Sequence, residues 1–321
     1  MTNIACIGAG YWGKNLIRNF HGLGVLHTIC DGRQDVIDSF AKQYPDVAGC
    51  LDVSEVFSNE EIQAVSIATP AETHFELIKR ALNAGKHVYV EKPLCLDEQH
   101  AKECIALAND LGLTLMVGHL LWYHPMVLEI KRAVQAGELG KLRYIYSNRL
   151  NMGLLRSEEN VLWSFAPHDI SMILGLVGEE PESVQAHSAN HLNPAIADQA
   201  VGLMKFSNNI SAHVFVSWLN PFKEQKLVVV GEDAMMVFDD TNQDWDQKLS
   251  KFAHSVEWDG ERPIAVKADP EFIKLPKAEP LKNECQHFID SFVDGSTPRT
   301  DGKEGLRVLK VLNKLQQAMD A

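Results

Sequence analysis

The sequence lacks the features that direct a chain to a membrane or to nucleic acid. No apolar run approaches the roughly 18 residues that a membrane-spanning helix needs, and no basic stretch or small-residue cleavage site precedes the first apolar segment. Basic residues are outnumbered, 30 against 43 acidic ones, which gives a net charge of −13. Such a charge disfavours loose binding to nucleic acid or anionic membranes. We therefore expect a cytoplasmic protein that binds a small molecule.

Cysteine is scarce and scattered. The six cysteines form no C-x-x-C pair, and Cys6 and Cys30 lie inside apolar, strand-like runs. This pattern favours reduced core residues over disulfides or metal ligands, so no metal is expected. Repeats and low-complexity segments are also absent, and the 321 residues, 45% of them hydrophobic and 23% charged, suit two globular domains.

The first 120 residues alternate short apolar runs with helical patterns. Strands are predicted at residues 3–8, 25–31, 64–68, 87–91 and 114–118, and helices at residues 14–23, 35–44, 74–84 and 97–111. This alternation predicts parallel βαβ units in a doubly wound Rossmann sheet, and we assign it to a domain of residues 1–120.

The pattern changes after residue 120. Helices are predicted at residues 125–136, 167–177, 281–294 and 303–320, and strands at residues 141–150, 183–189, 199–206, 210–218, 224–230 and 234–239. Consecutive strands without intervening helices indicate an α+β domain of residues 121–321 with a large, mostly antiparallel open sheet. We expect apolar strand residues such as Val214, Val216, Val228 and Val230 to leave one sheet face uncovered, as in a homodimer or homotetramer interface.

A glycine motif, Gly8-Ala-Gly10-Tyr11-Trp12-Gly13, stands between the first predicted strand and helix. Its glycines permit a tight turn, close approach of a pyrophosphate to backbone N–H groups, and close helix–strand packing. Asp31 follows Gly13 by 18 residues, where a carboxylate accepts hydrogen bonds from the adenosine ribose and repels a 2′-phosphate. NAD is therefore expected rather than NADP, although the Arg33 guanidinium can meet that phosphate or stack on adenine.

Two further motifs follow predicted strands. Thr69-Pro70 and His74 come after one strand and are expected to shape the nicotinamide pocket, and Glu91-Lys92-Pro93 comes after the next. The carboxyl ends of parallel strands form the edge at which such sheets bind ligands. A lysine at this edge can donate a hydrogen bond to a substrate hydroxyl or relay its proton, so Lys92 is a candidate catalytic and substrate-binding residue.

These motifs, with Gly137-Glu-Leu-Gly140, resemble the Gfo/Idh/MocA (glucose–fructose oxidoreductase/inositol dehydrogenase) family over essentially the whole chain. The resemblance implies an NAD-dependent dehydrogenase, a C-terminal sheet that often forms the oligomer interface, and a Lys-Pro peptide that is frequently cis. The expected cofactor-binding residues are Gly8, Gly10, Tyr11, Trp12, Gly13, Asp31, Arg33, Thr69, Pro70, His74, Glu91, Lys92 and Pro93.

The family's second catalytic motif is an Asp followed, four positions later, by a His. Here His168 matches the histidine, but Ser164 stands in place of the aspartate. His168 is predicted at the start of a helix, whose positive end favours the neutral imidazole that a general base needs. Lys92 and His168 are therefore the predicted catalytic pair, and either they act without the carboxylate or Asp169 takes part of its role.

A polar segment, residues 148–160, precedes His168. Its two arginines and three asparagines suit a polyhydroxylated or phosphorylated ligand. The segment is similar to family members that act at C3 of UDP-N-acetylated sugars, which implies a UDP-N-acetylhexosamine or its uronic acid in polysaccharide or lipid A biosynthesis. The expected substrate-binding residues are Lys92, Arg149, Asn151, Arg156, Trp163 and His168.

Two other functions stay open. A free cyclitol or monosaccharide dehydrogenase would use the same hydride chemistry on a substrate without a nucleotide. A non-catalytic nucleotide-binding regulator is supported only by Ser164 and opposed by the retained Lys92 and His168.

Overall fold

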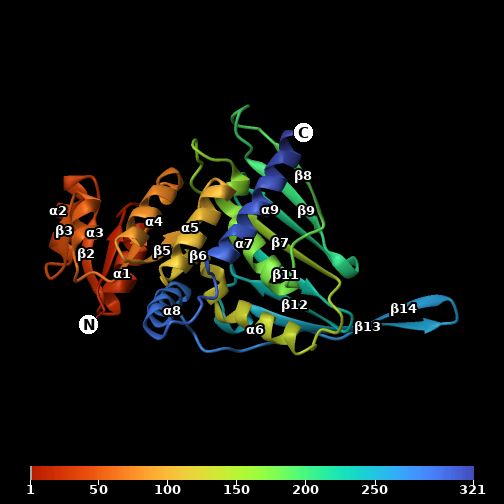
Figure 1. Ribbon diagram of the computed structural model, residues 1–321. Helices are drawn as coiled ribbons and strands as arrows, with labels where there is room; N and C mark the ends of the chain where they lie inside the picture. The colour runs from red at the N-terminus through yellow and green to blue at the C-terminus, as the bar shows by residue number, and fades with distance from the viewer. Residues whose placement is uncertain (1) are drawn as a thin grey trace. The chain divides into compact units, whose positions relative to one another are not determined.

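The computed structural model describes residues 2–321, which form two compact units. The first unit contains the chain up to Leu120 together with Glu279–Leu309, and the second contains Leu121–Ala278 and Lys310–Ala321. Figure 1 labels most of the helices and strands of both units. No helix among residues 2–321 combines the length and the apolar composition of a membrane span.

A parallel sheet in the order β3-β2-β1-β4-β5-β6 forms the centre of the first unit. Its strands are β1 (Ile4–Ile7), β2 (Leu26–Cys30), β3 (Ala48–Cys50), β4 (Ala64–Ile67), β5 (His87–Glu91) and β6 (Leu115–Gly118). Every residue of β1, β4 and β6 is buried, as expected for parallel strands that are covered on both faces. The strand order is that of a doubly wound Rossmann sheet, so the predicted fold is confirmed.

The connecting helices of this unit are α1 (Gly13–Gly22), α2 (Gln34–Gln43), α3 (Val53–Ser58), α4 (His74–Asn83) and α5 (Glu98–Asp110). All but α3 were predicted; β3 and α3 escaped prediction because both are too short to show a periodic pattern. Helix α8 (Pro280–Asp294) also belongs to this unit. Its Phe288 packs edge-on against Phe20 and Tyr89, with ring centroids 6.5 and 5.8 Å away.

The second unit is built on a sheet in the order β14-β13-β12-β11-β7-β10-β9-β8, with β15 paired to β13. The strands are β7 (Tyr144–Leu150), β8 (Ser183–Ala189), β9 (Gln199–Lys205), β10 (Ser211–Ser217), β11 (Glu224–Val230), β12 (Ala234–Asp239), β13 (Leu249–Asp259), β14 (Arg262–Lys267) and β15 (Glu271–Phe272). Strands β7 and β10 are parallel and the other pairs are antiparallel, which confirms the mostly antiparallel sheet. Strands β13 to β15 were not predicted; β14 is exposed along its whole length and shows no buried–exposed alternation.

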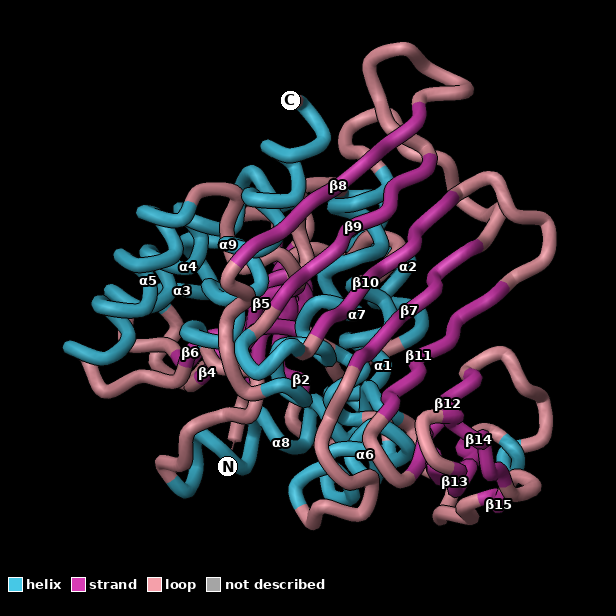
Figure 2. The backbone as a smooth tube through the Cα atoms, turned by 90° about the vertical axis from the view of Figure 1, so that its right-hand side faces the viewer, coloured by secondary structure: helices cyan, strands magenta, loops and turns pink. Residues whose placement is uncertain are grey.

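Helices cover one face of this sheet. Helix α7 (Val161–Val177) packs on β7, β9 and β10, and α6 (Pro125–Gln135) packs on β12 and α7. The last part of α9 (Gly302–Asp320) joins them, since a Cβ atom on Gly202 of β9 would lie 3.0 Å from the Leu315 side chain. On the other face, Figure 2 shows β8, β9, β10, β7 and β11 without a helix of the described residues in front of them.

The expected uncovered face carries different residues from those predicted. Val214 and Val216 pair with Ser147 and Arg149 of β7, on the face that packs against α7, and both valines are fully buried. Placing them on an uncovered face was therefore wrong, because the strand register turns them toward the helices. Val228 and Val230 do lie on the open face, in register with Tyr146 and Tyr144, but neighbouring side chains bury them. The exposed apolar side chains of this face are those of Tyr144 and Leu203, each 42% exposed.

Candidate active site

The glycine loop after β1 has the geometry that a bound dinucleotide requires. Gly8 has φ +92°, and a Cβ atom on it would lie 2.8 Å from the backbone of Ala68, whereas a Cβ atom on Gly13 would collide with the Gly8 carbonyl oxygen. No heavy atom comes within 4 Å of the Cβ position of Gly10. Gly8 and Gly13 therefore permit local packing, and Gly10 leaves space at the start of α1 where backbone N–H groups can meet a pyrophosphate.

Asp31 lies directly after β2 and is fixed against this loop. Its Oδ2 accepts a hydrogen bond from the backbone N–H of Ala9 at 2.9 Å, and its Oδ1 accepts one from the N–H of Arg33 at 3.1 Å. The Arg33 Nε atom is 3.4 Å from the same oxygen. Asp31 is thus preorganised to meet a ribose, and the Arg33 side chain, 62% exposed, is held beside the carboxylate.

His74 connects the two motifs that follow β4 and β5. Its Nδ1 lies 2.8 Å from the Pro93 carbonyl oxygen and its Nε2 lies 3.0 Å from the Thr69 carbonyl oxygen. The side chain is buried, and this burial lowers the pKa of His74 against the opposing effect of the hydrogen bonds to the two carbonyls. His74 therefore links the segment that follows β4 to the segment that follows β5. The Lys92–Pro93 peptide beside it is cis.

Glu91 accepts hydrogen bonds from the glycine loop and from its own strand end. Its Oε1 accepts from Nε1 of Trp12, in the glycine loop, and from the Tyr89 hydroxyl at 3.2 Å, and its Oε2 accepts from the backbone N–H of Lys92 at 3.3 Å. Burial raises the pKa of Glu91 to about 7, against the opposing effect of these donors and of Lys92. The structure thus joins Trp12, Glu91 and Lys92, three of the predicted residues, through one carboxyl group.

Sequence reasoning missed His119, which lies near Lys92, and its partner Glu304. His119 directly follows β6, and its Nε2 is 3.4 Å from Oε2 of Glu304 in α9. Burial and then the charge of Lys92 lower the pKa of His119 to about 3, which keeps the ring neutral. The position of His119 after a strand was the available signal, since the same rule singled out Lys92.

In the second unit, His168 lies well inside α7. The helix begins at Val161, where the side chain of Asn160 accepts hydrogen bonds from two backbone N–H groups, and it continues through Pro167. The prediction that His168 stands at a helix start was therefore wrong, so the helix dipole does not explain a neutral imidazole there. Ser164 is one turn before His168 on the same helix face, and its side chain is buried, 7% exposed.

Arg149 and Asp169 form a buried ion pair. Nε and Nη2 of Arg149 donate to the two Asp169 oxygens at 2.7 and 3.1 Å, and the Ser147 hydroxyl donates to Asp169 at 2.5 Å. Desolvation opposes the charge of Arg149, but Asp169 overcomes it, so the pKa of Arg149 stays above its usual value. Arg149 and Asp169 thus bind each other. Because Arg149 and Ser147 occupy the Asp169 carboxylate, it does not replace the carboxylate that the motif lacks at position 164.

The remaining predicted substrate residues are Trp163 in the first turn of α7, and Arg156 and Asn151 in the segment before it. Nε1 of Trp163 donates to the Gln316 side chain at 3.1 Å, and Arg156 pairs with Glu159 at 3.1 Å. The Arg156 side chain remains 34% exposed. Asn151 follows β7 directly, and its backbone N–H donates to the Ser217 carbonyl at 3.0 Å. Arg156 is thus the arginine of this segment whose side chain solvent reaches.

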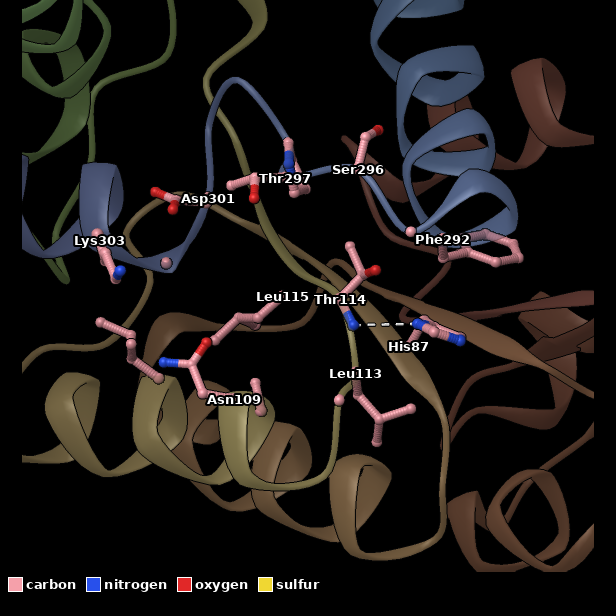
Figure 3. Close-up of a pocket in the computed structure, with 16 residues that line it drawn as sticks. His87, Asn109, Leu113, Thr114, Leu115, Phe292, Ser296, Thr297, Asp301 and Lys303 are labelled. Atoms are coloured by element: carbon pink, nitrogen blue, oxygen red, sulfur yellow. Dashed lines mark hydrogen bonds between the residues drawn. The ribbon is translucent and has the colours of Figure 1, made fainter.

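A hollow of about 290 Å³ lies in the first unit, away from the predicted residues (Figure 3). It is lined by residues at the amino ends of β5 and β6, including His87 and Thr114, and by the loop before α9. The backbone N–H of Thr114 donates to Nδ1 of His87 at 3.0 Å. Because the glycine loop and Lys92 lie at the opposite, carboxyl edge of the sheet, this hollow is no part of the candidate site.

Two family models match the chain. The model of an oxidoreductase family with an NAD-binding Rossmann fold, Gfo/Idh/MocA, matches residues 2–119, and the model of the Gfo/Idh/MocA C-terminal domain matches residues 127–237. Together they span more than half of the sequence.

Individual relatives match over nearly the full length. UDP-N-acetylglucosamine 3-dehydrogenase from Acidithiobacillus ferrooxidans is 26% identical over 98% of this chain and 96% of its own. Its solved structure covers 99% of this chain and 97% of its own, with a TM-score of 0.87. Inositol 2-dehydrogenase from Rhizobium meliloti is 24% identical over 94% of this chain and 92% of its own. A structure from Magnetospirillum magnetotacticum MS-1 is 31% identical over 98% of this chain and 99% of its own, with a TM-score of 0.84.

Proposed function

Because the chain belongs to the Gfo/Idh/MocA family of oxidoreductases, we propose that it is an NAD-dependent dehydrogenase that oxidises a sugar hydroxyl to a ketone. We place the reaction at C3 of a UDP-N-acetylated hexosamine or its uronic acid, in the synthesis of a cell-surface polysaccharide or lipid A. The observation that carries this choice is the full-length similarity to a UDP-N-acetylglucosamine 3-dehydrogenase.

The glycine loop and Asp31 are the groups we assign to the dinucleotide. The open space over Gly10 and the backbone N–H groups at the start of α1 suit the pyrophosphate, and Asp31, tied to Ala9, suits the adenosine ribose. Arg33 is held by the Asp31 carboxylate, which favours NAD over NADP. When bound there, NAD would supply the hydride acceptor that the oxidation requires.

Lys92 and His168 are the groups we assign to proton transfer. Lys92 follows β5 at the ligand-binding edge, and hydrogen bonds to its neighbour Glu91 fix the strand end from which it projects. Its ammonium group donates to the substrate hydroxyl oxygen, and the His168 imidazole accepts the proton as the carbonyl forms. Ser164 lies one turn from His168, so a hydroxyl stands where the family's motif has a carboxylate.

Substrate recognition is assigned to the segment before α7. Arg156 is the arginine we assign to the diphosphate, because its side chain is partly exposed and its acidic partners lie in the same short loop. Trp163 and Asn151 remain candidates for contact with the sugar or the base. We assign Arg149 a positioning role, since its guanidinium is buried against Asp169.

The alternative substrate is a free cyclitol or monosaccharide. The inositol 2-dehydrogenase of Rhizobium meliloti matches the chain over nearly the same length as the UDP-sugar enzyme does, which keeps this alternative open. The non-catalytic regulator is set aside, because the family to which the chain belongs is one of oxidoreductases.

The experiment that tests the proposal is a substrate panel read by NADH absorbance. The purified protein is given NAD with UDP-N-acetylglucosamine, its uronic acid, free N-acetylglucosamine, glucose and myo-inositol. We expect NADH only with the UDP-sugars, and we expect UDP to inhibit competitively. Oxidation of a free sugar or inositol without oxidation of either UDP-sugar would establish the alternative instead.

A further inference from the structure

A buried chain of hydrogen bonds connects helix α8 to the glycine loop. The Tyr89 hydroxyl lies 3.1 Å from Oε2 of Glu284 and 3.2 Å from Oε1 of Glu91, and that Glu91 oxygen accepts from Nε1 of Trp12. Glu284 and Tyr89 are fully buried. One phenol group thus stands between two carboxyl groups, one on α8 and one at the end of β5.

The number of protons shared by Glu284, Tyr89 and Glu91 follows from their geometry. A phenol carries a single proton and can donate it to only one carboxylate. If both carboxyl groups were ionised, the second would face the lone pairs of the Tyr89 oxygen inside the protein, without a donor. One of the two carboxyl groups must therefore carry a proton and donate it to Tyr89.

Glu284 is the better place for that proton. Glu91 receives hydrogen bonds on both of its oxygens, from Trp12, Tyr89 and the Lys92 N–H, which stabilise a carboxylate. By contrast, Oε1 of Glu284 has no hydrogen-bond partner among the described residues. An ionised carboxylate with a bare oxygen in the core costs far more than a neutral acid does.

We propose that Glu284 is a positioning residue that, as a neutral carboxylic acid, directs the Tyr89 hydroxyl toward Glu91 and so keeps Glu91 an ionised acceptor for Trp12 of the glycine loop. The hydrogen bonds then run in one direction, from Glu284 through Tyr89 to Glu91. The inference rests on the proposed function only in taking NAD as the ligand of that loop.

The surroundings of the chain support this assignment. Burial, followed by the charge of Glu91, raises the pKa of Glu284 well above its usual value, whereas the pKa of Glu91 is raised only to about 7. Besides Tyr89 and Glu284, the titratable groups that face Glu91 are Lys92 beside it and Cys285 on α8. Burial also raises the pKa of the Cys285 thiol, and Lys92 supplies positive charge near Glu91.

Gly118 of β6 shows that the hydroxyl position is tightly defined. A Cβ atom on Gly118 would lie 2.6 Å from the Tyr89 hydroxyl oxygen and 3.0 Å from both Glu91 oxygens. The Gly118→Ala variant must therefore displace either the hydroxyl or the carboxylate. It provides a second way to break the chain without removing any of its polar groups.

The protonation of Glu284 is tested by infrared spectroscopy without cofactor or substrate. We expect the C=O band of a neutral carboxylic acid to persist at pH 8 in the parent protein and to be lost in Glu284→Gln. The control is Glu279→Gln, because Glu279 lies just before the same helix but is partly exposed and paired with Arg18. Absence of the band in the parent protein at pH 8 would overturn the proposal.

The pH dependence of stability gives an independent test. A carboxyl group whose pKa is higher in the folded than in the unfolded protein stabilises the fold fully only below its unfolded pKa. This stabilisation is lost as the pH rises, because unfolded Glu284 releases its proton while folded Glu284 keeps it. Relative to the parent, Glu284→Gln should therefore gain about 6–12 °C in Tm between pH 5 and pH 8. An unchanged or reversed difference between the two pH values contradicts a neutral Glu284.

The positioning role is tested by the NAD dissociation constant, measured by calorimetry between pH 5.5 and 9. We expect affinity to fall as Glu91 takes up a proton, and we expect Tyr89→Phe to move the midpoint upward by about one pH unit, because a donor to ionised Glu91 is lost. Gly118→Ala should shift this midpoint in the same direction. Glu91→Gln should make the NAD affinity independent of pH over this range. Equal weakening at every pH, without a shift, would show a merely structural role. Failure to oxidise UDP-sugars would refute the proposed substrate but leave these measurements unaffected.

Discussion

The Asp31 carboxylate accepts a hydrogen bond from the backbone N–H of Ala9, 22 residues earlier and inside the glycine motif. The residue that we assign to the adenosine ribose is thereby tied to the loop that we assign to the pyrophosphate. We therefore expect a change at Asp31 to affect both the ribose and the pyrophosphate of the proposed NAD ligand.

The first prediction concerns cofactor choice. Asp31→Ala should weaken NAD binding about 10- to 100-fold, since a hydrogen bond to a charged group is worth roughly 1.5–3 kcal/mol, and it should improve the relative use of NADP. Asp31→Asn keeps an oxygen for the Ala9 N–H and removes the charge, so it should also gain relative NADP use. Kd values measured by calorimetry for both nucleotides check this. A preference for NADP in the parent protein would refute the assignment.

The second prediction concerns proton transfer. Lys92→Ala and His168→Ala should each lower kcat about 10²–10⁴-fold, the usual contribution of general acid–base catalysis. NAD affinity should change little, because neither side chain is assigned to the pyrophosphate or the ribose. Lys42→Ala, at an exposed position on α2, is the matched control and should behave as the parent does. Near-normal turnover in both active-site variants would remove these residues from the mechanism.

The third prediction separates the two arginines near the proposed diphosphate site. Arg156→Ala should raise KM for a UDP-sugar about 10- to 100-fold with a smaller effect on kcat, because the diphosphate binds equally in the ground and transition states. Steady-state kinetics measures this split. An unchanged KM for the UDP-sugar would show that Arg156 does not contact the diphosphate.

Arg149 should respond differently. Arg149→Ala leaves Asp169 buried without its cation, and losing one partner of a buried pair typically costs about 3–5 kcal/mol of stability. We therefore expect thermal unfolding to show a marked fall in Tm. A stable Arg149→Ala protein with a raised KM would instead return Arg149 to the substrate.

The last prediction concerns assembly through the open sheet face. Tyr144 and Leu203 are exposed there, and an uncovered apolar sheet face is a natural subunit interface. We expect a homodimer or homotetramer by light scattering, and we expect Leu203→Glu to yield monomers. Leu51→Glu, an equally exposed leucine of the first unit, serves as the control. A monodisperse parent monomer at micromolar concentration would contradict the prediction.

Local patterns identified much of the candidate site. The spacing Gly8, Gly10 and Gly13, and the positions of Asp31 and Lys92 directly after strands, follow from short-range periodicity and from the rule that parallel strands present their carboxyl ends at one edge. Predicted helix boundaries were less secure. Pro167 suggested a helix start because proline favours the first turn, whereas Asn160 caps α7 and the proline lies in its interior.

The sequence by itself determined most of the order of strands and helices, the glycine loop and the family, because each depends on neighbouring residues or on a fixed spacing. Tertiary structure alone decided which polar groups meet. Tyr89 and Glu284 are 195 positions apart, and Arg149 and Asp169 are 20 apart on different elements, yet each pair is joined inside the protein. Such partners are set by how elements pack and by the high cost of leaving a buried charge alone, and no periodic pattern encodes that.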